Sequence, residues 1–168
     1  LPEAQVDRFM MKVLVDYPSE DEEFVIVQRV TGEPVHASGV VTPERLLQLQ
    51  QQCRRGYVDP ALVRYAVTLV AATRSPGRFG LSAIERLLTF GASPRATIGL
   101  IEGARALAFL RGRDYVLPAD VVDLVPDVLR HRLVLSYEAL SEGQTPDQLI
   151  EQILQAVPVP EQPLGAHA

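Results

Sequence analysis

The sequence predicts a mainly α-helical protein, because signals for helix starts recur along the chain and the apolar residues between them follow a helical period. In each start, an N-cap residue that accepts a backbone hydrogen bond is followed by proline, which suits the first helical position. The four such pairs are Thr42-Pro43, Asp59-Pro60, Ser93-Pro94 and Thr145-Pro146. Ser19 predicts a further helix running to about Arg29, because Glu22 completes a capping box with it.

Apolar residues identify the helices that should form the core. The segment 61–72 is apolar on nearly all sides, which predicts the most buried helix of the set. The longest helix is predicted from Pro94 to about Leu110, with Gly112 ending it. Gly99 and Gly103 weaken that helix by up to about 1 kcal/mol each, so we expect them to allow close packing of another helix or a partner subunit.

Non-helical structure is predicted at four places. Only Phe9–Asp16 has the pattern of a strand. Residues 33–41 and 74–80 are predicted loops, whereas 81–88 has a helix-like pattern. The tail from Val157 to Ala168 is rich in proline, and we expect it to be extended and poorly ordered.

Composition excludes several classes of function. The 168 residues carry a net charge of −5, which disfavours a general nucleic-acid binder. One cysteine, Cys53, and three scattered histidines give no metal-ligand cluster, so no metal site is expected and a reducing, cytoplasmic setting fits. No apolar run approaches the roughly 20 residues that span a bilayer.

The chain also lacks the usual phosphate-binding loop. Its only lysine, Lys12, follows Met10-Met11 and not the glycines of a P-loop. Asp16 ends the predicted strand, but Tyr17-Pro18 follow it where a second carboxylate would stand, so it is not predicted to bind magnesium. The start at Leu1, inside a helix-like stretch, predicts that the chain is part of a longer protein.

One helix start could bind an anion. Ser93 is the predicted N-cap, Pro94 takes the first helical position and Arg95 the second. First-turn N–H groups and the helix dipole favour an anion there, and a guanidinium adds a forked donor. The alternative interpretation is an ordinary surface cap.

Five motifs occur in an order that resembles the MoxR-type AAA+ ATPases. They are Leu1 to Phe9 (LPEAQVDRF), Asp16-Tyr17-Pro18, Gly91 to Ala96 (GASPRA), Gly112 to Val116 (GRDYV) and Leu129 to Leu133 (LRHRL). The resemblance implies the C-terminal part of such an ATPase, a helical lid bundle preceded by one helix and one strand of the α/β core. The implied divisions are the end of that core at 1–18, a connecting helix and loop at 19–41, the lid at 42–156 and the tail at 157–168. The P-loop would then lie upstream.

The resemblance also implies roles for two arginines. Arg8 takes the place of the arginine finger, which acts in trans on the γ-phosphate held by a neighbouring subunit; the alternative is a salt bridge to Glu3 or Asp7. Arg95 takes the sensor 2 position, which senses that phosphate, in cis or in trans. Two further residues are expected to be structural. Asp120 lies in the first turn of a predicted helix, where a carboxylate suits the dipole, although Leu117 at the cap position makes a weak cap. His131 is expected to be solvated or packed.

For the full-length protein, the resemblance implies bound ATP and Mg, a hexameric ring, and chaperone-like remodelling or maturation of clients that often carry von Willebrand factor A domains. This chain alone is expected neither to bind ATP tightly nor to hydrolyse it. Two alternatives remain open: a helical interaction or assembly module without nucleotide sensing, and a helical DNA-binding domain that uses Arg54, Arg55 and Arg86.

Overall fold

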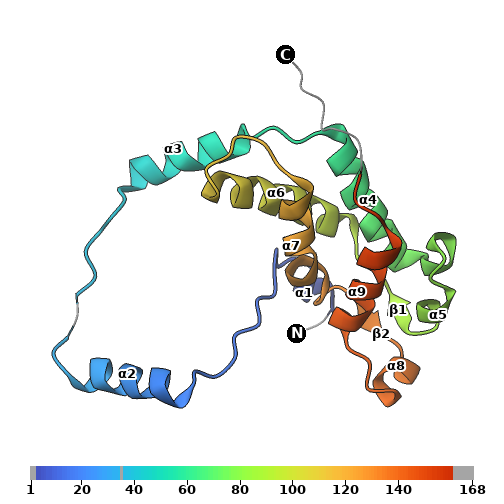
Figure 1. The fold of residues 1–168 in the computed structure, drawn as a ribbon, viewed down its shortest axis with the longest axis horizontal. Coiled ribbons are helices and arrows are strands. Elements are labelled where there is room, and N and C mark those ends of the chain that lie inside the picture. The colour runs from blue at the N-terminus through green and yellow to red at the C-terminus, as the bar shows by residue number, and fades with distance from the viewer. Residues whose placement is uncertain (1–2, 35, 161–168) are drawn as a thin grey trace.

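The computed structural model of the chain describes residues 3–34 and 36–160 (Figure 1). Its elements are α1 (Glu3–Val6), α2 (Glu20–Thr31), α3 (Pro43–Arg54), α4 (Pro60–Arg74), the 3₁₀ helix η1 (Pro76–Phe79), α5 (Ser82–Glu85), β1 (Leu88–Phe90), α6 (Pro94–Leu110), α7 (Pro118–Leu129), β2 (Val134–Leu135), α8 (Tyr137–Ser141) and α9 (Pro146–Ala156). The predicted mainly α fold is confirmed.

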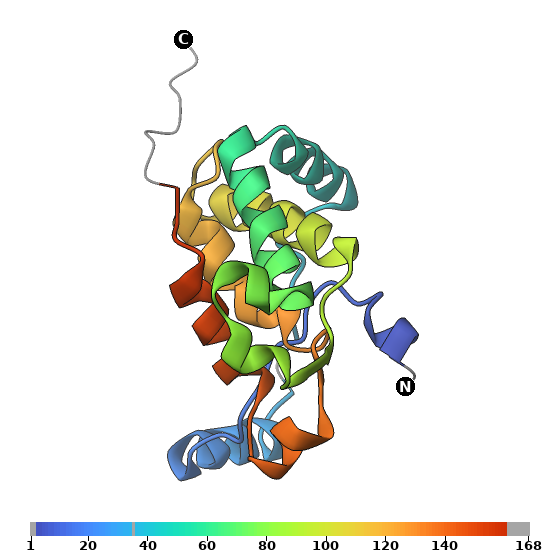
Figure 2. The same ribbon diagram turned by 90° about the vertical axis from the view of Figure 1, so that its right-hand side faces the viewer.

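A bundle of four helices forms the core. Helix α6 packs against α4 and α7, and α9 packs against α7 and α4 (Figures 1 and 2). Seven residues of α4 are buried, which confirms it as a deeply buried helix: Leu62, Tyr65, Ala66, Leu69, Val70, Ala72 and Thr73.

The predicted helix starts are present. Thr42, Asp59, Ser93 and Thr145 each accept a first-turn backbone hydrogen bond, with proline next in the chain, and Ser19 forms its capping box with Glu22. At α7, where Leu117 cannot cap, the Asp120 carboxylate instead accepts the Leu117 N–H at 2.8 Å. Local signals therefore fix where the long helices begin.

The small residues of α6 allow the close packing that the sequence predicts. A Cβ on Gly103 would lie 3.0 Å from both Leu124 Cδ1 and Met11 Cε, and one on Gly99 would lie 3.5 Å from Val128 Cγ1. Both α7 and the N-terminal segment therefore lie against this face of α6.

The predicted strand at Phe9–Asp16 is wrong. These residues form no ladder, and in the part of the chain that the structure describes the only sheet is β1 with β2. A strand needs a neighbour to take its backbone hydrogen bonds. Here the Lys12 N–H bonds instead to the carbonyl of Asp127 in α7, at 2.8 Å.

The helix-like prediction for 81–88 is only partly right. Helix α5 is a single turn, after which β1 pairs antiparallel with β2, Leu88 opposite Leu135 and Phe90 opposite Val134. The loop predicted at 74–80 contains η1. Of the predicted tail, Val157 is buried against the core, whereas 161–168 lie outside the described residues.

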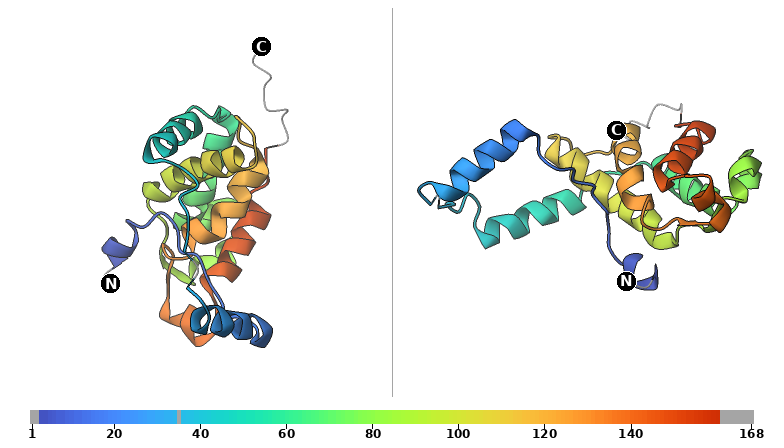
Figure 3. Two further views of the ribbon diagram at one scale, coloured as in Figure 1. Left: turned by 90° about the vertical axis from the view of Figure 1, so that its left-hand side faces the viewer. Right: turned by 90° about the horizontal axis from the view of Figure 1, so that it is seen from below.

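Helices α2 and α3 form an arm beside the bundle (Figure 3). None of the residues of either helix is buried, and α2 exposes Phe24, Val25, Ile26, Val27 and Val30. Helix α3 contacts α6, whereas α2 extends away from the bundle (Figures 1 and 3).

The start of α6 is held against the end of α4 by a close backbone approach. The Thr73 hydroxyl accepts the Ala92 N–H at 2.9 Å, and a Cβ added at Gly91 would lie 2.3 Å from the Thr73 carbonyl oxygen. Only glycine fits at this point of the chain.

We therefore expect Gly91→Ala to lower the free energy of unfolding by about 1–3 kcal/mol, because two backbone segments must separate. Gly39→Ala is the matched control, since a Cβ there meets nothing within 4 Å. Denaturant unfolding of the two variants checks this, and equal stability would contradict it.

Candidate functional site: an arginine cluster around Asp7

The first turn of α6 has the N-cap that the sequence predicts. Ser93 has an extended backbone (φ −75°, ψ 168°), and its Oγ accepts the Arg95 N–H at 3.2 Å. The Arg95 side chain is 55% exposed. Ser93 therefore acts as the N-cap, and Arg95 lies in the first turn with its guanidinium accessible.

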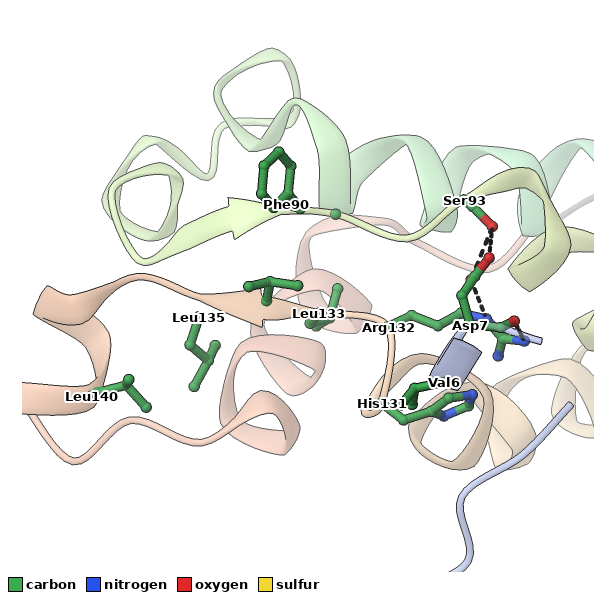
Figure 4. Close-up of a pocket in the computed structure, with 11 residues that line it drawn as sticks. Val6, Asp7, Phe90, Ser93, His131, Arg132, Leu133, Leu135 and Leu140 are labelled. Atoms are coloured by element: carbon green, nitrogen blue, oxygen red, sulfur yellow. Dashed lines mark hydrogen bonds and ion pairs between the residues drawn. The ribbon is translucent and has the colours of Figure 1, made fainter. Parts of the chain in front are cut away.

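The carboxylate of Asp7 lies next to this turn. Ser93 Oγ–H donates to it at 3.0 Å, and Arg95 Nη1 lies 3.4 Å from Oδ2. Arg132 donates to Oδ1 at 3.1 Å (Figure 4). An acidic side chain from the N-terminal segment thus takes the place of an anion beside the helix start.

Arg8 and Arg95 line the same cleft, of about 180 Å³, together with Asp7, Glu102 and Arg132. Arg8 is exposed and makes no ion pair with any side chain that the structure describes. The salt bridge to Asp7 that we considered for Arg8 is therefore absent, because Arg95 and Arg132 take that carboxylate, whereas the Glu3 side chain, the other partner considered, lies outside the part that the structure describes.

Arg132 is the residue of this site that the sequence did not indicate. Its side chain is 2% exposed, and each of its five N–H groups has an acceptor. Besides Asp7 Oδ1, the acceptors are the carbonyl oxygens of Asp7 (3.1 Å), Phe9 (2.6 Å), Met10 (3.1 Å) and Val128. Burial lowers the pKa of Arg132, and the Asp7 carboxylate opposes that shift.

His131 packs against the same segment. Of the two outcomes expected for this residue, solvated or packed, the structure shows the second. Its Nε2 lies 3.0 Å from the Phe9 carbonyl oxygen, to which it can donate. Its Nδ1 is buried and has no partner among the described residues. Burial lowers the pKa of His131 below 6.5, because protonation would place an unpaired N–H in the interior.

A second charged cluster, at the other end of α6, is structural. Asp120 is fully buried and accepts hydrogen bonds from Arg111 and Arg113 at 2.7–2.8 Å. Burial alone would raise the pKa of Asp120, but these bonds and the Leu117 N–H together lower it. The cluster joins the end of α6 to the start of α7.

Other sites find no support in the described part of the chain. Three or more potential metal ligands gather nowhere in it. The three arginines considered for DNA do not form one patch, because Arg86 pairs with Glu138 and Glu142 beyond α5, whereas Arg54 and Arg55 end α3 (Figure 1). Of the described helices, none combines the length and apolarity needed to cross a membrane.

Comparisons with known proteins place this arrangement in a family. Residues 81–153 match the AAA lid domain. The chain is 47% identical over 161 residues to Chaperone MoxR1 of Mycobacterium tuberculosis, covering 96% of this chain and 43% of that protein. It is 37% identical over 175 residues to Protein MoxR of Paracoccus denitrificans, covering 95% and 51%. The crystal structure of a Cytophaga hutchinsonii protein provisionally assigned as an ATPase superposes with a TM-score of 0.92 at 39% identity, covering 96% and 49%.

The fold thus belongs to the class of AAA lid domains, joined here to an N-terminal segment that bears Asp7 and Arg8. The chain spans about half the length of the curated relatives it matches. It belongs to the MoxR family of AAA+ ATPases and corresponds to the C-terminal part of its relatives.

The lowered pKa of His131 makes stability depend on pH. Because the unfolded chain binds a proton on this histidine more readily than the folded chain does, the free energy of unfolding is highest above pH 6.5 and falls as the pH drops below that value. We expect the melting temperature of the wild type to fall between pH 7 and pH 5 by more than that of His131→Gln. His36→Gln, which changes an exposed loop histidine, should keep the wild-type pH dependence. Equal pH profiles for the wild type and His131→Gln would contradict this.

Proposed function

We propose that this chain is the lid and subunit-interface portion of a MoxR-type ATPase, which couples ATP hydrolysis to chaperone-like remodelling or maturation of partner proteins. The observation that carries the proposal is the shared cleft of Arg8 and Arg95. Two exposed guanidinium groups, from residues 87 positions apart in the chain, face one small space beside a helix N-terminus. That arrangement suits a terminal phosphate more than it suits an ordinary surface cap.

The two arginines would act on charge that develops during phosphoryl transfer. Arg8 has no ion-pair partner among the side chains that the structure describes, and it would reach an anion and serve as the arginine finger. Arg95 would serve as sensor 2, exchanging its 3.4 Å contact with Asp7 for a phosphate oxygen. The carboxylate would then hold Arg95 when no phosphate is present. ATP and Mg would be held by the nucleotide-binding part of the ATPase, and the described residues supply arginines for phosphate but no metal-ligand cluster.

The shared cleft bears on whether Arg95 acts in cis or in trans. If Arg8 acts on the nucleotide of a neighbouring subunit, a guanidinium lining the same cleft approaches that same nucleotide. We therefore propose that both arginines act in trans. Such a site requires an assembly of subunits, and we propose a hexameric ring.

The proposal extends to cellular setting and clients. One similar protein carries the name chaperone, which supports a remodelling role here. A cytoplasmic setting is also part of the proposal. Client proteins with von Willebrand factor A domains remain part of the proposal.

The exposed apolar residues of α2 favour a second candidate, a helical module that binds a partner protein without sensing nucleotide. Phe24 is 62% exposed and Val30 is 79% exposed, which is costly unless protein covers them. In that case Arg95 and Asp7 would form only a salt bridge.

Substitution of the two arginines in the complete ATPase separates these candidates. We expect Arg8→Ala to lower kcat about 10³-fold, because it removes a charge that stabilises the transition state. Arg95→Ala should lower kcat about 100-fold. Steady-state hydrolysis at saturating ATP measures both, with Arg78→Ala as the control for loss of an exposed arginine elsewhere. Wild-type kcat in both variants would favour the interaction module.

The chain alone should show no ATPase activity, because Lys12 is its only lysine and no P-loop surrounds it. We expect no phosphate release above background from the purified chain and no saturable ATP binding at micromolar concentration. A phosphate-release assay and calorimetric titration check this, and measurable turnover would contradict the assignment.

A further inference from the structure

The backbone carbonyl groups that accept hydrogen bonds from Arg132 lie on both sides of Arg8 in the chain. Two of them are the carbonyl oxygens of Asp7 and Phe9, at 3.1 and 2.6 Å. The first belongs to the peptide group that joins Asp7 to Arg8, and the second to the peptide group that follows Phe9. The guanidinium of Arg132 therefore holds the backbone on both sides of Arg8. We refer to Arg132 with its acceptors on Asp7, Phe9 and Met10 as the Arg132 clamp.

Burying the Arg132 guanidinium costs free energy of hydration, which its hydrogen bonds to the N-terminal segment must offset. An arginine that is 2% exposed has lost its hydration and must have all its donors satisfied by protein. Other contacts already attach the segment further along: the Lys12 N–H bonds to Asp127 O at 2.8 Å, and Arg130 donates to Lys12 O at 2.7 Å. Those contacts hold the chain four residues beyond Arg8, whereas the Arg132 clamp holds it at Arg8 itself.

We propose that Arg132 is a positioning residue for Arg8, fixing the backbone of the arginine finger on the lid so that its guanidinium enters the neighbouring site in one orientation. The proposal rests on the proposed function of Arg8. A side chain carried on a fixed backbone loses less orientational freedom on reaching the transition state, and small misplacements of such groups cost large factors in rate.

The Arg132 clamp also connects the two arginines of the cleft. Arg132 donates to Asp7 Oδ1 while Arg95 contacts Oδ2, so one carboxylate joins the finger segment to the first turn of α6.

Lysine cannot replace arginine in this position. Its ammonium has three donors at one point, whereas the planar guanidinium spreads five N–H groups toward acceptors on two sides. Arg132→Lys keeps the charge and removes the fork, so it is the variant that tests the clamp.

The experiment compares kcat and KM for ATP in the complete ATPase carrying Arg132→Lys, Arg8→Ala or both changes. We expect Arg132→Lys to lower kcat about tenfold to 100-fold with KM for ATP changed less than threefold, because Arg8 is still present but poorly placed. The double variant should have the kcat of Arg8→Ala alone, since Arg132 acts only through Arg8.

The control for general destabilisation is Arg113→Lys. Arg113 is also largely buried and donates two hydrogen bonds to Asp120, but it lies at the other end of α6. Its replacement should leave kcat within twofold of the wild type at a temperature where all variants remain folded. Melting temperatures are measured for each protein.

Asp7→Asn tests the same clamp at the acceptor, with a side chain of nearly the same shape that leaves Arg132 itself in place. It removes the charge that Arg132 and Arg95 share, so it is measured in chains that already carry Arg95→Ala, where it should lower kcat and should add nothing once Arg8→Ala is also present. This variant decides the question if Arg132→Lys fails to fold.

Each result has a distinct meaning. Wild-type kcat in Arg132→Lys, a further loss in the double variant, or an equal loss in Arg113→Lys would each overturn the proposal for Arg132 and leave the role of Arg8 standing. Wild-type kcat in Arg8→Ala would overturn the proposed function, and the role of Arg132 with it.

Discussion

The burial of one positive charge determines how the N-terminal segment lies on the bundle. Arg132 cannot be hydrated where it is, so all five of its N–H groups must find oxygen atoms in the protein. Four of the five acceptors belong to residues 7–10, and only one, the carbonyl of Val128, belongs to the helix before it. The segment that carries Asp7 and Arg8 is therefore held against the helical bundle and is not a loose extension.

Packing at α6 makes this arrangement possible. Gly99 and Gly103 leave room for Met10 and Met11 to lie against the helix, and Gly91 brings the start of α6 against the end of α4. Larger residues at these places would push the N-terminal segment outward and move Ser93 away from Asp7. The glycines that weaken α6 as an isolated helix thus place its first turn beside the acid that binds it.

The sequence predicted the parts of the structure that depend on neighbours in the chain. Helix starts at Ser19, Thr42, Asp59, Ser93 and Thr145 follow from a cap and a proline or glutamate within three residues. The contact of Arg132 with Asp7 joins residues 125 positions apart, and no local pattern marks it. The strand predicted at Phe9–Asp16 failed for the same reason, because a strand is defined by its neighbour. Arg8 and Arg95 were identified by resemblance, whereas the position of the Asp7 carboxylate in their shared cleft became visible only in the folded structure.

The arm formed by α2 has a thermodynamic consequence. Its apolar side chains, together with Val13, Leu14 and Val15, are exposed to water, and the transfer of such surface into a protein interior is driven by entropy near room temperature. Any association that covers this surface carries a negative change in heat capacity and strengthens on warming and in sulfate or phosphate salts. The polar cleft around Asp7 depends on salt in the opposite way, because its exposed charges are screened as ionic strength rises. One chain therefore presents two surfaces whose interactions respond oppositely to the same buffer.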